Sequence, residues 1–128
     1  MRFLLDTHAV IWWLVNSPKL SAKARDAIAD HDNTVLVSAA SAWEIATKVR
    51  LGKWPEAEAL VAVFPGILDA NGFKPLAVTA HHALHSGSLP VAHTDPFDRM
   101  LAAQAELEDL DLITVDPAFG SFNVQTLW

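Results

Sequence analysis

The chain has 128 residues, of which 52% are apolar and 19% are charged, so it is long enough to bury one hydrophobic core, and we expect a single domain over residues 1–128. It has no cysteine, which excludes disulfides and thiolate ligands. It also has no uninterrupted apolar segment of about 18 residues, so we expect a cytoplasmic protein without a membrane span. The net charge of −6 excludes a strongly basic surface.

Apolar segments rich in β-branched residues alternate with segments of helical periodicity. In chain order we predict a strand at 3–6, helices at 7–15 and 20–30, a strand at 34–39, a helix at 41–53, a helical stretch at 55–72, a weak strand at 73–78, a short helix at 79–87, a helix within 93–110, a strand at 112–115 and a candidate last strand at 123–128.

Capping and proline positions refine these bounds. Ser21 and Asp95 are predicted N-caps, and Gly52 is a predicted helix stop. Pro65 is expected to kink or break its helix, and Pro75 suits only an edge strand or a strand end. Since the strands lack a polar face, they predict an α/β fold of three layers, with a central, mostly parallel sheet of about five short strands flanked by helices.

Four acidic residues fall at the ends of predicted strands or in the first turns of predicted helices. They are Asp6, Glu44, Asp98 and Asp116. In a parallel sheet these positions share one edge, where ligands bind. Carboxylates packed together repel, and Mg²⁺ or Mn²⁺ would compensate because hard cations prefer oxygen ligands. Such an ion activates water and stabilises charge on a phosphate oxygen, so the pattern indicates phosphodiester hydrolysis.

Each of these acids except the first also has a purely local explanation. Glu44 follows Ser41 by three residues, as in a capping box. Asp95 and Asp98 favour the start of a helix, and Asp116 precedes a proline that begins a turn. Asp6, which directly follows the first strand, has no such explanation, because burying a carboxylate after an apolar run is costly when it has no partner. Taken together, the acids favour a metal site.

Basic and aromatic residues near these acids are candidates for substrate contact. Lys48, Arg50 and Arg99 lie on or near the same helices and are expected to hold phosphates, with ordinary surface charge as the alternative. Trp43 precedes Glu44 and is expected to wall the site, with stacking on a nucleobase as the alternative.

Four segments, taken in order, carry a family likeness. They are FLLDTHAVIWWL, VSAASAWEIATKVRLGK, HTDPFDRMLAAQA and LITVDPAF. Over nearly its whole length the chain resembles PIN-domain ribonucleases of the VapC type, the toxin halves of bacterial toxin–antitoxin pairs. The resemblance implies a PIN-like parallel sheet and an endonucleolytic cut of RNA that depends on Mg²⁺ or Mn²⁺. A bound cation would also neutralise part of the acidic charge.

The resemblance carries the family's catalytic and metal-binding acids onto Asp6, Glu44, Asp98 and Asp116. Asp95 is a fifth candidate, either as the direct ligand or as the cap that supports the ligands, and we prefer Asp98 as the ligand. The resemblance also implies a homodimer and a VapB-like antitoxin as partners, beside the RNA substrate.

Two other functions stay open. One is a catalytically silent PIN-like module that binds RNA or protein. The other is an enzyme that forms an aspartyl phosphate on the acid after the first strand. That chemistry favours a second aspartate two residues later, where this chain has His8.

Overall fold

The computed structural model describes residues 1–128 and contains a five-stranded sheet in the order β3-β2-β1-β4-β5, in which every neighbouring pair is parallel. The strands are β1 (Arg2–Leu5), β2 (Thr34–Ser38), β3 (Lys74–Leu76), β4 (Asp111–Ile113) and β5 (Thr126–Leu127). The predicted α/β fold class, with about five short strands, is confirmed.

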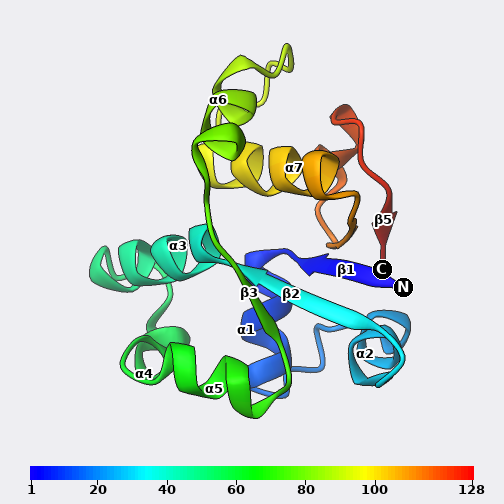
Figure 1. Cartoon of the computed structure of the whole chain (residues 1–128). Coiled ribbons are helices and arrows are strands. Elements are labelled where there is room, and N and C mark those ends of the chain that lie inside the picture. The colour runs from blue at the N-terminus through cyan, green and yellow to red at the C-terminus, as the bar shows by residue number, and fades with distance from the viewer.

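Helices connect the strands and cover both faces of the sheet. They are α1 (Thr7–Leu14), α2 (Ala22–Ala29), α3 (Ala39–Arg50), α4 (Glu58–Val61), α5 (Phe64–Ala70), α6 (Ala80–Ser88) and α7 (Pro96–Glu108), with 3₁₀ turns η1 (Pro55–Ala57) and η2 (Pro117–Ser121). Figure 1 shows α6 and α7 on one side of the sheet and α1, α2, α4 and α5 on the other. None of these helices has both the length and the apolar character needed to cross a bilayer.

The sheet separates two hydrophobic clusters. Successive strand residues point to opposite faces, so Phe3 and Leu5 join the larger cluster and Leu4 joins the smaller. Residues of α1 to α5 complete the larger cluster, and residues of α7 and the segment after β4 complete the smaller. Burial on both faces explains why the strands are apolar without alternation.

Several local predictions are confirmed. The Ser21 side chain accepts a hydrogen bond from the Ala24 amide at 3.0 Å and caps α2. Gly52, at φ +75°, follows Leu51, the C-cap of α3, in a conformation that favours glycine. Pro75 lies in β3, an edge strand of the sheet, where its missing N–H costs least.

The helical stretch predicted at 55–72 is broken near Pro65, as expected: α4 ends at Val61, and Pro65 occupies the first turn of α5, where a missing N–H is tolerated. One local prediction is wrong. The strand predicted at 112–115 ends at Ile113, and the chain then turns toward η2. Asp116 therefore lies beyond β4, at the start of a 3₁₀ turn.

We predict that Leu112→Ala destabilises the protein by about 2–5 kcal/mol, because the Leu112 side chain is fully buried and its loss leaves a cavity. Leu84→Ala is the matched control: Leu84 is 70% exposed, and its truncation should change stability by less than about 0.5 kcal/mol. Urea unfolding of both variants measures the difference, and equal losses would contradict the assigned core.

Candidate active site

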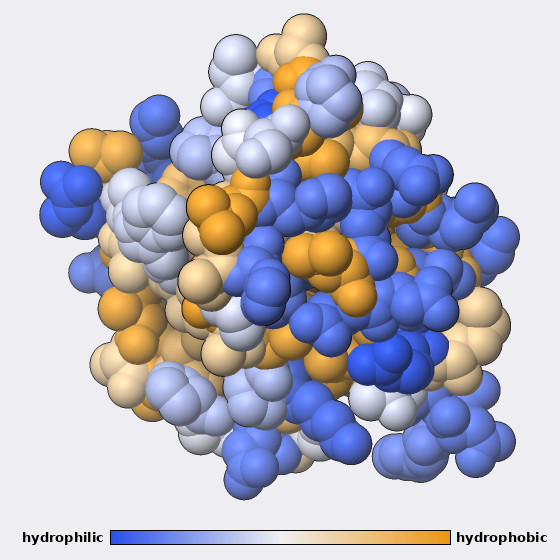
Figure 2. Space-filling model, turned by 45° about the horizontal axis from the view of Figure 1, so that its top comes forward, coloured by the Kyte–Doolittle hydropathy of each residue, from blue (hydrophilic) through white to orange (hydrophobic).

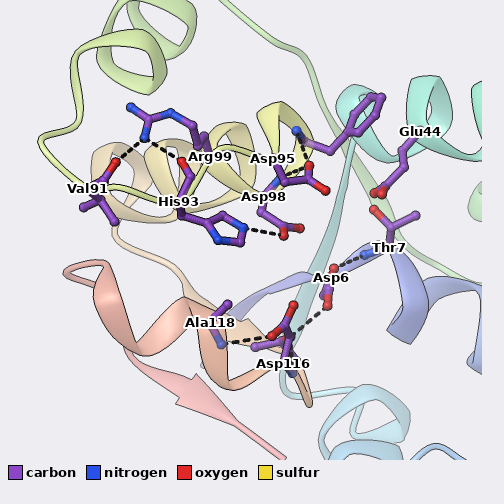
Figure 3. A network of polar contacts seen from close by, with 12 residues as sticks. Asp6, Thr7, Glu44, Val91, His93, Asp95, Asp98, Arg99, Asp116 and Ala118 are labelled. Atoms are coloured by element: carbon purple, nitrogen blue, oxygen red, sulfur yellow. Dashed lines mark hydrogen bonds and ion pairs between the residues drawn. The ribbon is translucent and has the colours of Figure 1, made fainter.

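Five acidic side chains lie near one edge of the sheet, where β1 and β4 end and α3 and α7 begin. Asp6 directly follows β1, Glu44 lies in the second turn of α3, and Asp98 lies in the first turn of α7. Figure 3 shows these residues, with Asp95 and Asp116, arranged around one region between the elements. The carboxyl ends of parallel strands and the starts of the following helices place ligand-binding groups at such an edge.

Asp6 is buried, with 6% of its surface exposed. One carboxylate oxygen accepts the Thr7 amide at 2.7 Å, and the other accepts the Thr114 hydroxyl at 2.7 Å. Burial, together with the charges of Asp98 and Glu44, raises the pKa of Asp6 to about 7, against these two hydrogen bonds. Negative charge is thus crowded where water is scarce.

Glu44 is buried on α3 and pairs with Lys48, one helical turn later. The capping-box explanation for Glu44 is wrong, because the hydroxyl of Ser38 caps α3 and accepts the Ala40 amide at 3.0 Å. The Lys48 ammonium also lies 4.5 Å from the centre of the Trp54 ring. A phosphate would therefore have to compete with Glu44 for Lys48.

Asp95 and Asp98 have different roles at the start of α7. Asp95 is the predicted N-cap, and its Oδ1 accepts the amides of Phe97 at 2.8 Å and Asp98 at 3.2 Å. The Asp98 carboxylate instead shares a hydrogen bond with Nε2 of His93 at 2.8 Å. Burial raises the pKa of Asp98, and Asp95 and Glu44 add to this, while the hydrogen bond from His93 opposes it.

Asp116 joins the site through Thr114. The Asp116 carboxylate caps η2 by accepting the Ala118 amide at 2.9 Å, so the predicted turn is present. The Asp116 amide donates to the Thr114 hydroxyl at 3.0 Å, and this hydroxyl donates to Asp6. Sequence analysis missed Thr7 and Thr114. The sequence signal that could have identified them is a threonine directly after an acid, for Thr7, and directly after a buried strand, for Thr114.

Two observations decide how these residues could hold a cation. No group of three or more His, Asp or Glu side chains is close enough to hold a metal ion as the side chains now lie. The donor chemistry nevertheless fits a hard cation, because carboxylate oxygens predominate and the buried carboxylate of Asp6 lies near the charges of Asp98 and Glu44. Glu44 and Asp98 would exchange their pairing with Lys48 and His93 for the ion.

Arg99 does not fit the predicted phosphate contact. Its guanidinium donates to the backbone carbonyls of Ser86, Leu89, Val91 and His93, which occupies all five of its N–H groups. Figure 3 shows the guanidinium turned away from Asp6 and Asp98. The expectation that Arg99 binds substrate is therefore corrected: the side chain is fully used inside the protein. Arg50 is exposed at the end of α3.

Aromatic residues lie within two positions of three of the acids in the sequence. Trp43, which precedes Glu44, is 59% exposed and meets the Phe97 ring edge-on at 4.6 Å between centroids. Exposed His8 stacks on Trp12, with the ring centroids 5.2 Å apart. On the face shown in Figure 2, apolar residues reach the surface in separate patches among hydrophilic ones.

Comparisons with known proteins agree with this fold. The family model described as "PIN domain" matches residues 3–124. Ribonuclease VapC16 of Mycobacterium tuberculosis is 42% identical over 72 residues, which are 53% of this chain and 51% of that relative, so the match spans about half of the relative's length.

Two solved structures are similar over almost the whole chain. The structure of VapBC2 from Rickettsia felis, bound to a promoter DNA fragment, has a TM-score of 0.70 at 16% identity, covering 99% of this chain and 98% of that one. VapBC-1 from nontypeable Haemophilus influenzae has a TM-score of 0.65 at 20% identity, covering 99% and 97%. At these identities the likeness concerns the fold.

The raised pKa of Asp6 predicts a pH-dependent loss of stability in EDTA. Between its ordinary value of 3.8 and about 7, the folded state binds the proton more tightly than the unfolded state, so stability falls as pH rises through this range. At about 1.36 kcal/mol per pH unit, the full effect is roughly 4 kcal/mol. Asp6→Asn removes this loss but also one accepted hydrogen bond, which costs about 1 kcal/mol.

We therefore expect Asp6→Asn to be more stable than the parent at pH 8 by about 2–3 kcal/mol, and to have no advantage near pH 4. Urea unfolding at both pH values measures this. Asp26→Asn, on the exposed face of α2, is the control without a pH-dependent gain of this size. A gain of equal size at pH 4 would show that the effect has another origin.

Proposed function

The chain belongs to the PIN-domain family, and we propose that it is a divalent-metal-dependent endoribonuclease of the VapC type, the toxin of a toxin–antitoxin pair. The observation that supports this most directly is the buried carboxylate of Asp6 with Asp98 and Glu44 nearby: burial, and to a lesser extent these two charges, raise the pKa of Asp6. The name of the 42% identical relative, a ribonuclease, supports the same reaction.

In this proposal Asp6, Glu44, Asp98 and Asp116 hold Mg²⁺ or Mn²⁺, with Asp95 as the cap of α7. The ion supplies an activated water and neutralises charge on the scissile phosphate. The chain contributes orientation. Thr7 and Thr114 hold both oxygens of Asp6. Lys48 pairs with Glu44 and holds its side chain one helical turn away on α3.

The rim supports a nucleic-acid substrate. Proteins that bind single strands combine cationic groups with aromatic rings on which bases stack. Here the Lys48 ammonium lies within 6 Å of the Trp54 and Phe97 rings. These two rings in turn contact the exposed rings of His8 and Trp43. A net charge of −6 makes an ion at the site more important, because the acids would otherwise repel RNA.

The proposal includes a VapB-like antitoxin and a homodimer as partners. The two similar structures described above are VapBC assemblies with the same fold, which supports an antitoxin partner for this chain. A catalytically silent PIN-like module is the second candidate, because the acids do not converge on a metal position as they now lie. Dependence of cleavage on divalent ions separates the two.

We predict that the chain cuts RNA with Mg²⁺ or Mn²⁺, that EDTA abolishes cleavage, and that Asp6→Asn and Asp98→Asn each lower the rate by at least about 100-fold. Each substitution removes a charged ligand while leaving the hydrophobic core untouched, so circular dichroism should be unchanged. Cleavage of a labelled RNA, mapped at its ends, measures the rate.

Asp26→Asn is the matched control, because this aspartate lies on an exposed helix face away from the site. Its rate should equal that of the parent. Cleavage at the parent rate by a folded Asp6→Asn variant would refute the site assignment, and RNA binding without cleavage by the parent would favour the silent module.

We predict that Trp43→Ala raises KM for RNA about tenfold with a smaller change in kcat, because stacking of one base contributes about 1–3 kcal/mol. Trp43→Phe should restore most of the affinity. Leu51→Ala, which removes an exposed apolar side chain just beyond the same helix, is the control with unchanged KM. A KM unaffected by Trp43→Ala would exclude this ring as a contact for the substrate.

A further inference from the structure

The segment between α6 and α7, residues 89–95, has no regular structure, yet it runs beside the proposed site. A segment of this kind needs side chains to fix its path, because its carbonyl groups have no helix or sheet partners. Four carbonyls of this region and of the end of α6 point to one side chain, that of Arg99 on α7.

The hydrogen bonds of Arg99 use all three nitrogens of its planar guanidinium. Nε and Nη2 donate to the Ser86 carbonyl at 3.1 and 2.8 Å, and Nη2 also donates to Leu89 at 2.8 Å. Nη1 donates to the carbonyls of Val91 at 2.7 Å and His93 at 3.0 Å. A lysine has only three N–H donors on a flexible stem, so it cannot reproduce this pattern.

His93 links this segment to the acids. Its carbonyl is held by Arg99, and its ring is held at both ends, by Asp98 at 2.8 Å and by an edge-on contact with Phe122 at 5.8 Å between centroids. Figure 3 shows the resulting chain of contacts from Arg99 through His93 to the Asp98 carboxylate. Arg99 and Asp98 are adjacent in sequence, yet they are connected through a segment that precedes both.

We propose that Arg99 is a positioning residue of the active site, which fixes residues 89–93 so that His93 holds the Asp98 carboxylate in place. Asp98 alone, in the first turn of α7, is free to rotate about its side-chain torsions. His93 selects one orientation, and Arg99 determines where His93 stands. Misplacing a reacting group by about 1 Å costs about 100-fold in rate, so the effect is large enough to detect. The role in cleavage rests on the proposed function.

The test uses Arg99→Lys, which keeps the charge but loses the fork, together with His93→Ala and the double variant. We expect Arg99→Lys to lower kcat for RNA by about tenfold or more with KM within about twofold, and His93→Ala to lower kcat similarly. Because both act through one path, the double variant should be no slower than the slower single variant. Arg2→Lys is the control with unchanged kinetics, because Arg2 is exposed at the start of β1 and its guanidinium donates to a single carbonyl, that of Glu108.

Two kinetic results would overturn the proposal. A raised KM with unchanged kcat would mean that Arg99 contacts RNA, and multiplied losses of kcat in the double variant would mean that Arg99 and His93 act independently.

A second measurement does not depend on activity. In nitrogen NMR spectra of the metal-free protein, the His93 ring signal should move between the parent and Arg99→Lys as much as between the parent and Asp98→Asn. An unchanged signal in a folded Arg99→Lys variant overturns the proposal.

Should Arg99→Lys fail to fold, the comparison of two His93 variants takes its place. His93→Gln, which can still donate to Asp98, should keep more kcat than His93→Ala, and equal losses overturn the proposal. A parent chain that cuts no RNA refutes the proposed function, and the NMR comparison still decides the positioning role.

Discussion

A carboxylate placed directly after an apolar strand loses its water shell and receives no charge partner from the strand itself. Asp6 is in this position, and the rest of the site follows from how the chain compensates. Two donors reach its oxygens: the amide of the adjacent residue Thr7, and the hydroxyl of Thr114, which is distant in sequence and lies after β4. These hydrogen bonds stabilise the charged form, but burial and the neighbouring acids outweigh them, so the pKa is raised. An ionised Asp6 is therefore a group that gains from a cation.

The other acids have partners of their own. Glu44 is paired one helical turn later with Lys48, and Asp98 is paired with His93 from the segment before α7. Asp116 stabilises a turn through the Ala118 amide. In the metal-free site each of these three carboxylates thus has its own hydrogen-bond partner. Three events are coupled, because each changes the electrostatic field around the same acids. They are proton binding at Asp6, the replacement of Lys48 and His93 by an ion, and the approach of RNA.

How much of this could be predicted from the sequence depends on the range of the interaction. The strand and helix order followed from apolar runs and periodicity, and the caps at Ser21 and Asp95 followed from residue type, because these signals are local. The start of a helix at Pro65 was missed because the same residue breaks a helix in its interior and suits its first turn. The roles of Thr114 and Arg99 were not predictable, since they depend on the path of irregular segments that periodicity does not encode.

The first turn of α7 shows why neighbouring residues in one motif have such different roles. Asp95 caps the helix, Asp98 faces the other acids, and Arg99 holds the preceding segment. An α-helix turns by about 100° per residue, so adjacent side chains leave it in different directions. Asp98 therefore reaches the ring of His93, whereas Arg99 reaches its carbonyl. Because Asp95 fixes where the helix begins, it sets the rotation of both. A substitution at Asp95 would therefore reorient Asp98 and Arg99 together. The start of α7 thus determines the geometry of this part of the site.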